Sequence, residues 1–329
     1  YGTAPDKITY NAPNHKFEHT FNIYSDYTYY FLNFDGGSGL RIEDQEQSTL
    51  APTYTCTNFT EAVFYEKDLS SLIKSGKDWV GERMDSNIPL LEIPEYTFPN
   101  LSAGKQTWIR YRLAARAPAK TDFTVTINGV EIARPTCSNY SQYIYGTETV
   151  GIKSFFPETE KVKISFRYNG TGSDLGWLDW FELNVPRDLI FTGGQMAFAD
   201  PFSVSAGRVT KFQLQASSPA VTIWEVTDPL HPKRVNTDIQ GNTTTYVLQT
   251  DTLRQFLAWD NTSFLSATFK EKVINQDLHA IASADMLIVT HQDYLEHANR
   301  LADHHRSFDG MKVAVAINEQ VYNEFSSGA

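Results

Sequence analysis

The sequence predicts a mainly β chain in three parts: an antiparallel β-sandwich or jelly roll, a second, smaller all-β domain, and the first β-α-β-α units of an α/β domain. Short runs of alternating apolar and polar residues, separated by turn residues, recur before Pro186 and again after it. Helical periodicity between two apolar runs is clear only near the C-terminus. We therefore place the parts at residues 1–186, 187–275 and 276–329.

The first part has the pattern of a sandwich made of short strands. Asn128-Gly129 stands between two alternating runs and predicts a hairpin with a type I′ turn, which needs positive φ at both central positions. A short connecting helix is expected from Asp68 to Gly76. The alternation predicts strands within residues 17–31, 108–116, 123–127, 130–132, 161–168 and 177–183.

The second part repeats the pattern of short strands with turns between them. Pro229 and Pro232 force a turn after the strand that contains Trp224. The expected strands lie at residues 202–204, 209–214, 221–226, 244–248 and 266–269. These features predict a smaller all-β domain.

The last part has the pattern of one parallel crossover. Residues 284–290 and 312–317 are short apolar runs, and residues 294–308 between them have helical spacing. Two parallel strands cannot bury both faces of a sheet. We therefore expect further strands to complete this sheet, and the chain to be the front part of a larger protein.

The ends of the helices in this part also carry local signals. Thr290 and Asp293 form a capping box at the start of the first helix, and Gly310 supplies a left-handed end. Asn318 is expected to cap a second helix that runs through Phe325.

Composition limits the classes of function. With 41% hydrophobic and 20% charged residues, the 329-residue chain is globular. Its net charge of −11, and the lack of any cluster of five basic residues, exclude nucleic acid as the main partner. No run of 18 apolar residues occurs, so no transmembrane segment is expected. The start at Tyr1, without Met or a basic and apolar leader, and the Tyr- and Thr-rich composition predict an exported protein without its signal peptide.

The two cysteines, Cys56 and Cys137, both fall in the β-rich first half. They allow either one disulfide or two free buried thiols, and the sequence leaves both interpretations open. Neither has metal-ligand spacing, and neither ends a parallel strand, where a nucleophile of an α/β enzyme would be held. We predict no catalytic, cofactor-binding or metal-binding residue in this chain.

Other candidates for chemistry have simpler interpretations. Asp35 and Asp174 stand in glycine-rich loops, where we interpret them as turn residues rather than Ca²⁺ ligands. The histidines near the C-terminus have no i, i+4 pair and no H-E-x-x-H pattern, so they predict a solvated helix surface rather than a metal site. These histidines are His279, His291, His297, His304 and His305.

Part of the chain resembles a known family. The segments that match the opening of gingipain-type cysteine peptidase domains are Leu287–Glu296, Lys312–Val315 and Val321–Gly328. Within the last of these, Tyr-Asn-Glu-Phe-Ser-Ser-Gly is the most specific. The segments that resemble the region before that domain in the type IX secretion sortases of Bacteroidetes are Gly176–Leu183, Arg187–Leu189 and Trp224–Pro229.

The resemblance implies a caspase-like α/β domain with a His-Cys dyad. Such an enzyme is a cysteine endopeptidase and transpeptidase that removes C-terminal sorting domains from type IX secretion cargo and attaches the cargo to surface lipopolysaccharide. The resemblance places the dyad downstream of Ala329 and matches His291 to a strand–helix junction, so this chain is expected to be inactive alone. It also implies no cofactor, an outer-membrane barrel partner (PorV-like), secreted cargo as a second partner, and peripheral attachment to the bacterial outer membrane at the cell surface.

Two other classes stay open. A carbohydrate- or surface-binding module would be supported by exposure of Trp108, Trp177 or Trp180 on one concave face, and burial of all three would remove its main motive. A structural docking fragment of a surface complex would be supported by a large exposed apolar patch beside residues 284–325.

Overall fold

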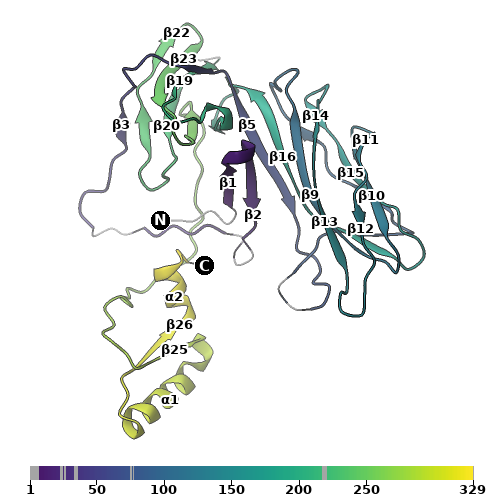
Figure 1. The fold of residues 1–329 in the computed structure, drawn as a ribbon. Coiled ribbons are helices and arrows are strands. Elements are labelled where there is room, and N and C mark those ends of the chain that lie inside the picture. Colours follow the sequence, from purple (N-terminus) through teal and green to yellow (C-terminus); the bar gives the residue numbers. More distant parts are fainter. Residues whose placement is uncertain are drawn as a thin grey trace. The chain divides into compact units, whose positions relative to one another are not determined.

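The computed structural model describes residues 7–22, 25, 27–32, 36–74, 76, 78–216 and 221–328. The chain forms two compact units. One unit contains Tyr1–Lys7, Thr20–Leu40 and Phe264–Ala329, and the other contains Ile8–His19 and Arg41–Ser263. Strands make up most of the regular structure of the described chain, as the ribbon shows, which confirms the mainly β prediction (Figure 1).

The larger unit begins with a small hairpin and contains two β-sandwiches. The hairpin consists of β1 (Lys7–Asn11), the one-turn helix η1 (Ala12–Asn14) and β2 (Lys16–Thr20).

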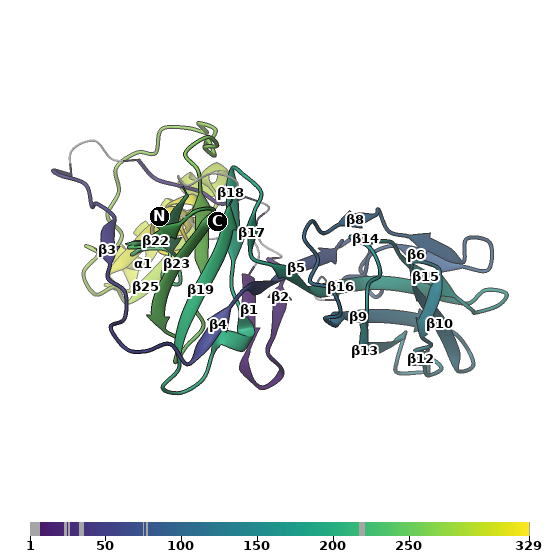
Figure 2. The ribbon, with the colours of Figure 1, turned by 90° about the horizontal axis from the view of Figure 1, so that it is seen from above.

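The first sandwich packs two antiparallel sheets around an aromatic core. One sheet has the order β13-β9-β16-β5, with β6 also paired to β16, and its strands run side by side in Figure 2. The other has the order β11-β10-β15-β7, with β12 also paired to β10. The strands of the first sheet are β5 (Asn58–Glu66), β6 (Arg83–Asp85), β9 (Thr107–Arg116), β13 (Thr147–Phe155) and β16 (Leu175–Asp188). The strands of the second are β7 (Leu90–Glu92), β10 (Thr121–Ile127), β11 (Val130–Ala133), β12 (Thr136–Cys137) and β15 (Ile164–Tyr168), and the short pair β8 (Tyr96–Thr97) and β14 (Lys161–Val162) lies apart from both.

Rings from both sheets meet in this core because inward positions alternate with polar outward ones. The ring of Phe166 lies 6.1 Å from that of Tyr111 and 5.9 Å from that of Phe181, measured between centroids. All three side chains are fully buried.

The second sandwich contains the strands that follow Asp188 together with two strands from the N-terminal region. Its sheets have the orders β17-β19-β23-β22, with β4 also paired to β19, and β18-β24-β20-β21-β3. Its elements are β3 (Glu43–Gln45), β4 (Tyr54–Cys56), β17 (Ile190–Phe191), β18 (Gln195–Phe198), the one-turn helix η2 (Pro201–Ser203), β19 (Val209–Ala216), β20 (Thr222–Glu225), β21 (Lys233–Val235), β22 (Asp238–Gln240), β23 (Thr243–Gln249) and β24 (Phe256–Trp259). In its core, Phe212 stacks on Tyr246, and Phe256 meets both rings edge to face, with all centroids within 5.3 Å of one another.

The smaller unit contains the α/β element. β25 (Met286–Thr290) and β26 (Val313–Ile317) pair in parallel, with η3 (Gln292–Tyr294) and α1 (Leu295–Phe308) between them and α2 (Asn318–Phe325) after them. The predicted crossover is therefore present. Few of its side chains are buried, chiefly Ala298, Ala302, Val313 and Ala316.

The predicted bounds of the parts differ from the structure at the N-terminal end. β3 and β4 lie before the first sandwich in the sequence, but they pair in parallel with β21 and β19 of the second. Residues 20–40 group with the α/β element instead of with the first sandwich. Alternation within a strand does not show which distant strand it pairs with, so sequence order misplaced these segments.

Several predicted elements are wrong in detail. Residues 202–204 begin inside η2, where Asp200 caps the turn, and residues 266–269 form no strand. The described residues of 68–76 form a turn with a single bridge from Ser70 to Val80 instead of a helix. In the run at residues 17–31 only β2 is a strand, and Ile23 lies outside the described residues.

Helix ends also differ from the expected caps. His291, not Thr290, caps η3: its Nδ1 accepts a hydrogen bond from the Asp293 backbone N–H at 3.2 Å. Asn318 is the first residue of α2 rather than its cap. Gly310 has the expected positive φ of 68°.

Candidate functional site

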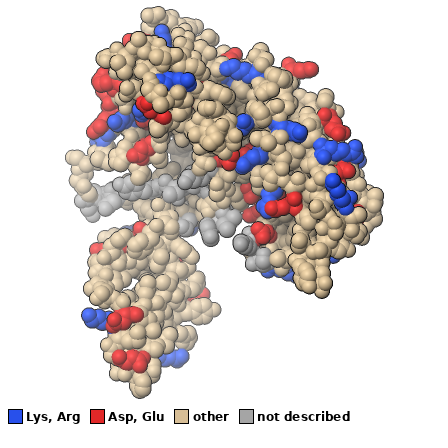
Figure 3. All heavy atoms as spheres, in the orientation of Figure 1, with Lys and Arg blue, Asp and Glu red and all other residues tan. Residues whose placement is uncertain are grey.

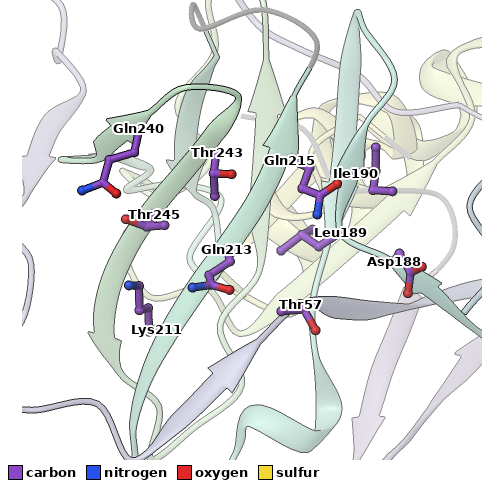
Figure 4. Close-up of a pocket in the computed structure, with 10 residues that line it drawn as sticks. All are labelled: Thr57, Asp188, Leu189, Ile190, Lys211, Gln213, Gln215, Gln240, Thr243 and Thr245. Carbon is purple, nitrogen blue, oxygen red and sulfur yellow. The ribbon is translucent and has the colours of Figure 1, made fainter.

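A polar groove lies on the outward face of the second sandwich. It has a volume of about 590 Å³ and is lined by Thr57, Asp188, Leu189, Ile190, Lys211, Gln213, Gln215, Gln240, Thr243 and Thr245 (Figure 4). Strand alternation builds this lining, because Phe212 and Leu214 point into the core and leave Lys211, Gln213 and Gln215 outside.

Cross-strand register brings the lining side chains together. Gln213 pairs with Thr245 and Gln215 with Thr243, so amide and hydroxyl groups form two rows across β19 and β23. Gln240 on β22 extends the row that contains Thr243.

The wall of the groove is the connection between the sandwiches. The Leu189 backbone N–H donates to the Thr57 carbonyl at 2.8 Å, and the Gln215 N–H donates to the Leu189 carbonyl at 2.9 Å. Asp188 accepts a hydrogen bond from the Ser102 hydroxyl at 2.6 Å. The backbone of this wall is therefore fixed to both sandwiches.

This groove was not predicted from the sequence. Its signal was the alternation of Lys211, Gln213 and Gln215 in one strand, which is what any half-exposed strand shows. The concave shape depends on the pairing of β19 with β4 and with β17. β4 is distant from β19 in sequence, and the pairing with β17 is short.

A buried charge cluster joins the N-terminal hairpin to the first sandwich. His19 Nδ1 lies 2.7 Å from Glu182 and His19 Nε2 lies 2.8 Å from Glu66. Arg110 is 2.6 Å from the other oxygen of Glu182 and 3.1 Å from Glu18. Burial alone would lower the pKa of His19, but hydrogen bonds and charges of Glu182 and Glu66 outweigh it and raise the pKa to about 9.

The two cysteines lie in different cores. Cys56 is buried in the second sandwich and Cys137 in the first, and both are free thiols, so the disulfide interpretation does not hold in this structure. Burial raises the pKa of the Cys56 thiol well above its ordinary value and that of Cys137 to about 11. Neither thiol has the exposure or the low pKa of a nucleophile.

The C-terminal histidines are not brought together as a group. His291 contacts Asp293, and His305 contacts Asp309 at 2.5 Å. His279 lies in a cluster with Asp277 and Glu324. The possible metal-ligand atoms of these three residues lie within 4.8 Å of one another.

Glu324 in that cluster has a structural role. Its two oxygens accept hydrogen bonds from the Gln276 side chain and from the backbone N–H groups of Leu278 and His279, at 2.8 to 2.9 Å. These bonds, that from Gln276 first, lower its pKa to about 2. The carboxylate fixes the turn at residues 276–279 to α2.

The loop aspartates also behave as turn residues or fall outside the structure. Asp174 accepts a hydrogen bond from the Thr171 backbone N–H at 3.1 Å. Asp35 lies outside the described residues.

None of the three candidate tryptophans of the first sandwich, Trp108, Trp177 and Trp180, forms an exposed platform. Trp177 is buried, and Trp108 and Trp180 are only partly exposed. The Lys16 ammonium lies 3.9 Å from the centroid of Trp108, and the Arg110 guanidinium lies 4.9 Å from that of Trp180.

Surface charge does not form a single-sign field on the face seen in Figure 3. Lys and Arg side chains are mixed with Asp and Glu there. The α-helices of the described chain are too short and too polar to cross a membrane.

Comparison with known proteins gives two informative matches. The profile of peptidase family C25 matches residues 279–329. The crystal structure of dimeric latent PorU from Porphyromonas gingivalis matches 99% of this chain with a TM-score of 0.88 and 24% sequence identity. The chain covers 32% of that PorU chain. These matches confirm the resemblance inferred from the sequence and show a PorU-like fold.

More distant structures resemble single parts of the chain. Carbohydrate-binding module CBM36 in complex with calcium and xylotriose matches 39% of this chain and 99% of its own, with TM-score 0.25 and 13% identity. Insecticidal delta-endotoxin Cry8Ea1 from Bacillus thuringiensis matches 30% of this chain and 18% of its own, with TM-score 0.22 and 11% identity. Scores this low support no functional comparison. No curated protein matches the sequence.

Proposed function

We propose that this chain is the non-catalytic part of a cell-surface cysteine peptidase of the gingipain type, which acts as a sortase on type IX secretion cargo. The enzyme would remove the C-terminal sorting domains of the cargo and attach the cargo to surface lipopolysaccharide. The observation that supports this most is the PorU-like fold over 99% of the chain, together with the family C25 match at residues 279–329.

The chemistry of the chain is consistent with a supporting role. A cysteine peptidase needs a thiolate beside an imidazole. Cys56 and Cys137 are buried thiols with raised pKa values, and neither lies in the family C25 segment. The dyad of the proposed enzyme is therefore not built from these two residues.

The α/β element supports docking onto further structure. Leu287 and Val289 on β25 are 60% and 50% exposed, and Phe308 on α1 is 79% exposed. Strands of parallel sheets are usually covered on both faces. In the proposed enzyme these side chains would be covered by the remainder of the peptidase domain.

Partners and location follow from the same proposal. The protein would be exported, would attach peripherally to the outer membrane through a barrel partner (PorV-like), and would meet secreted cargo with C-terminal sorting domains. No cofactor enters this proposal. A carbohydrate-binding role based on the tryptophans is disfavoured, because none of Trp108, Trp177 and Trp180 is exposed as a platform.

Deletion of the gene in the source bacterium tests the function. We expect secreted proteins to keep their C-terminal sorting domains and to lose their lipopolysaccharide modification, measured by mass spectrometry of the surface fraction. Re-expression of the wild-type gene should restore both steps. Normal removal of sorting domains in the deletion strain would contradict the proposal.

The isolated chain provides a second arm of that test. The purified 329-residue chain should hydrolyse no peptide, and a cysteine-alkylating reagent should label neither thiol until denaturant is added. Peptide turnover, or rapid labelling of Cys56 or Cys137 in the native chain, would show that a nucleophile has been misassigned.

A further inference from the structure

Four polar side chains of the groove have no side-chain partner within the described part of the chain. Lys211, Gln213, Gln240 and Thr245 make no side-chain hydrogen bond or ion pair to another residue of the described chain. An amide or hydroxyl group without a protein partner can exchange its water for a ligand without losing an internal contact.

The outward face of a sheet in the first sandwich shows a different pattern. There the Thr126 and Ser165 hydroxyls lie 2.5 Å apart, and Lys163 pairs with Glu92 at 2.7 Å. Arg134 likewise pairs with Asp122 at 3.0 Å. These pairs satisfy part of that face internally, whereas the four groove side chains have no such partner in the described chain.

The shape of the groove supports binding. Its volume of about 590 Å³ lies in the usual range for small-ligand sites, about 300 to 1,000 Å³. The hydrogen-bonded backbone at Thr57 and Leu189 forms one wall, and the rows of β19 and β23 form the floor (Figure 4).

The chemistry of the lining selects the class of ligand. One cation, Lys211, and one anion, Asp188, do not favour a polyanion or a polycation. Peptide recognition needs pockets for alternate side chains, and the apolar lining consists of Leu189 and Ile190 alone. Glutamine amides and threonine hydroxyls each donate and accept hydrogen bonds, as do the hydroxyl groups of a sugar.

We infer that the groove formed by Lys211, Gln213, Gln215, Gln240, Thr243 and Thr245 binds a short oligosaccharide. The ligand lies across β19 and β23, with its hydroxyl groups on the two polar rows. Affinity is low, with a Kd of about 1 mM, because no aromatic ring in the groove stacks on a sugar face. The inference rests on the groove alone and does not use the proposed peptidase role.

Titration of the purified chain with trisaccharides tests this inference. The probes are maltotriose and mannotriose, which are neutral, and trigalacturonate, which is anionic. We expect at least one of them to shift the amide NMR signals of β19, β22 and β23. If trigalacturonate binds more tightly than the neutral probes and Lys211→Gln abolishes that difference, the ligand is an acidic glycan. If only the neutral probes bind, the ligand is a neutral glycan.

Substitutions locate the site. Gln213→Ala and Gln215→Ala should each weaken binding about three- to tenfold, as expected for one lost hydrogen bond to a ligand. Gln142→Ala, an exposed glutamine of the first sandwich, is the matched control and should leave the Kd unchanged. Each variant should keep the wild-type melting temperature, because these side chains contact solvent.

Three results would overturn the inference. One is the lack of any signal shift in the groove with all three probes. Another is a wild-type Kd in both groove variants. The third is binding of an extended, sequence-unrelated peptide in the groove by a chain that binds none of the sugars. None of these results bears on cargo processing in the deletion strain, so the two proposals fail separately.

Discussion

At the scale of single residues, the contacts of His19 with Glu66 and Glu182 have the clearest consequence for stability. Its two ring nitrogens each meet a carboxylate, its ring stacks on Phe64 with centroids 4.7 Å apart, and its side chain is 4% exposed. This role was not predictable from the sequence, because His19, Glu66 and Glu182 are far apart in the chain. Pairing of β16 with β5 brings the two glutamates together.

The raised pKa of His19 predicts a specific dependence of stability on pH. Its folded pKa of about 9 lies above the ordinary 6.5, so its contribution is complete below pH 6.5 and is lost as the pH rises through 9. We expect a loss of up to about 3 kcal/mol of unfolding free energy over this window. Burial raises the pKa of Asp179 to about 6, so most of its titration takes place below the pH window of 6.5 to 9 in which His19 loses its proton.

Denaturant unfolding of the wild type and of His19→Gln at several pH values measures this effect. The wild type should lose stability between pH 6.5 and 9, and the variant should show a flatter profile. Parallel profiles would mean that His19 is not charged in the folded protein.

At the scale of elements, the Asn128-Gly129 hairpin shows what local sequence can predict. Both residues have the positive φ that a type I′ turn requires, 49° and 82°. The Asn128 side chain also accepts from the Lys163 N–H at 2.8 Å and donates to the Lys161 carbonyl at 3.0 Å. The turn was predictable because two adjacent residues encode it, whereas the bonds to β14 and its neighbours depend on a distant strand.

Substitution of Gly129 isolates the cost of the backbone conformation. A Cβ at Gly129 would meet nothing within 4 Å, so Gly129→Ala should destabilise the protein by about 1 kcal/mol through φ alone. Gly129→Asn is the matched control and should cost less, because asparagine tolerates positive φ. Equal melting temperatures for the wild type and Gly129→Ala would contradict the assigned turn.

Two of the failed element predictions have separate physical causes. Asp68–Gly76 carries a cap and a glycine stop, but Leu69 and Ile73 are each 60% exposed, and Leu72 is the apolar side chain of this segment that packs against a core cluster of the described chain. Short helices need tertiary packing more than local propensity. Residues 202–204 were expected to form a strand because the sequence does not show that Asp200 caps a turn at that point.

At the scale of the whole molecule, the two units differ in the apolar surface that they bury. The sandwiches have extensive aromatic cores, whereas α1 and β26 bury mainly alanine and valine. The mainly β architecture and the parallel crossover were predictable from periodicity. The assignment of residues 20–40 and of β3 and β4 was not, because it depends on contacts between segments far apart in sequence, such as Lys270 with Tyr29 and Arg234 with Asp44.

This difference predicts uneven local stability. Backbone amides of β25 and β26 should exchange with deuterium at least roughly tenfold faster than those of β9 and β16, which are paired on both sides. Hydrogen exchange followed by mass spectrometry gives the comparison. Equal protection of the two groups would show that the α/β element is stabilised by more than its buried alanines and valines.

The connection between the two sandwiches has a mechanical consequence. Two chain segments cross there, at Thr57 and Leu189, and a hydrogen bond of 2.8 Å joins them. Because two hydrogen-bonded segments join the sandwiches at this point, we expect twisting of one sandwich against the other to be more restricted than it would be about a single linker. The same segments form a wall of the polar groove, so bending at this crossing would change the width of the groove.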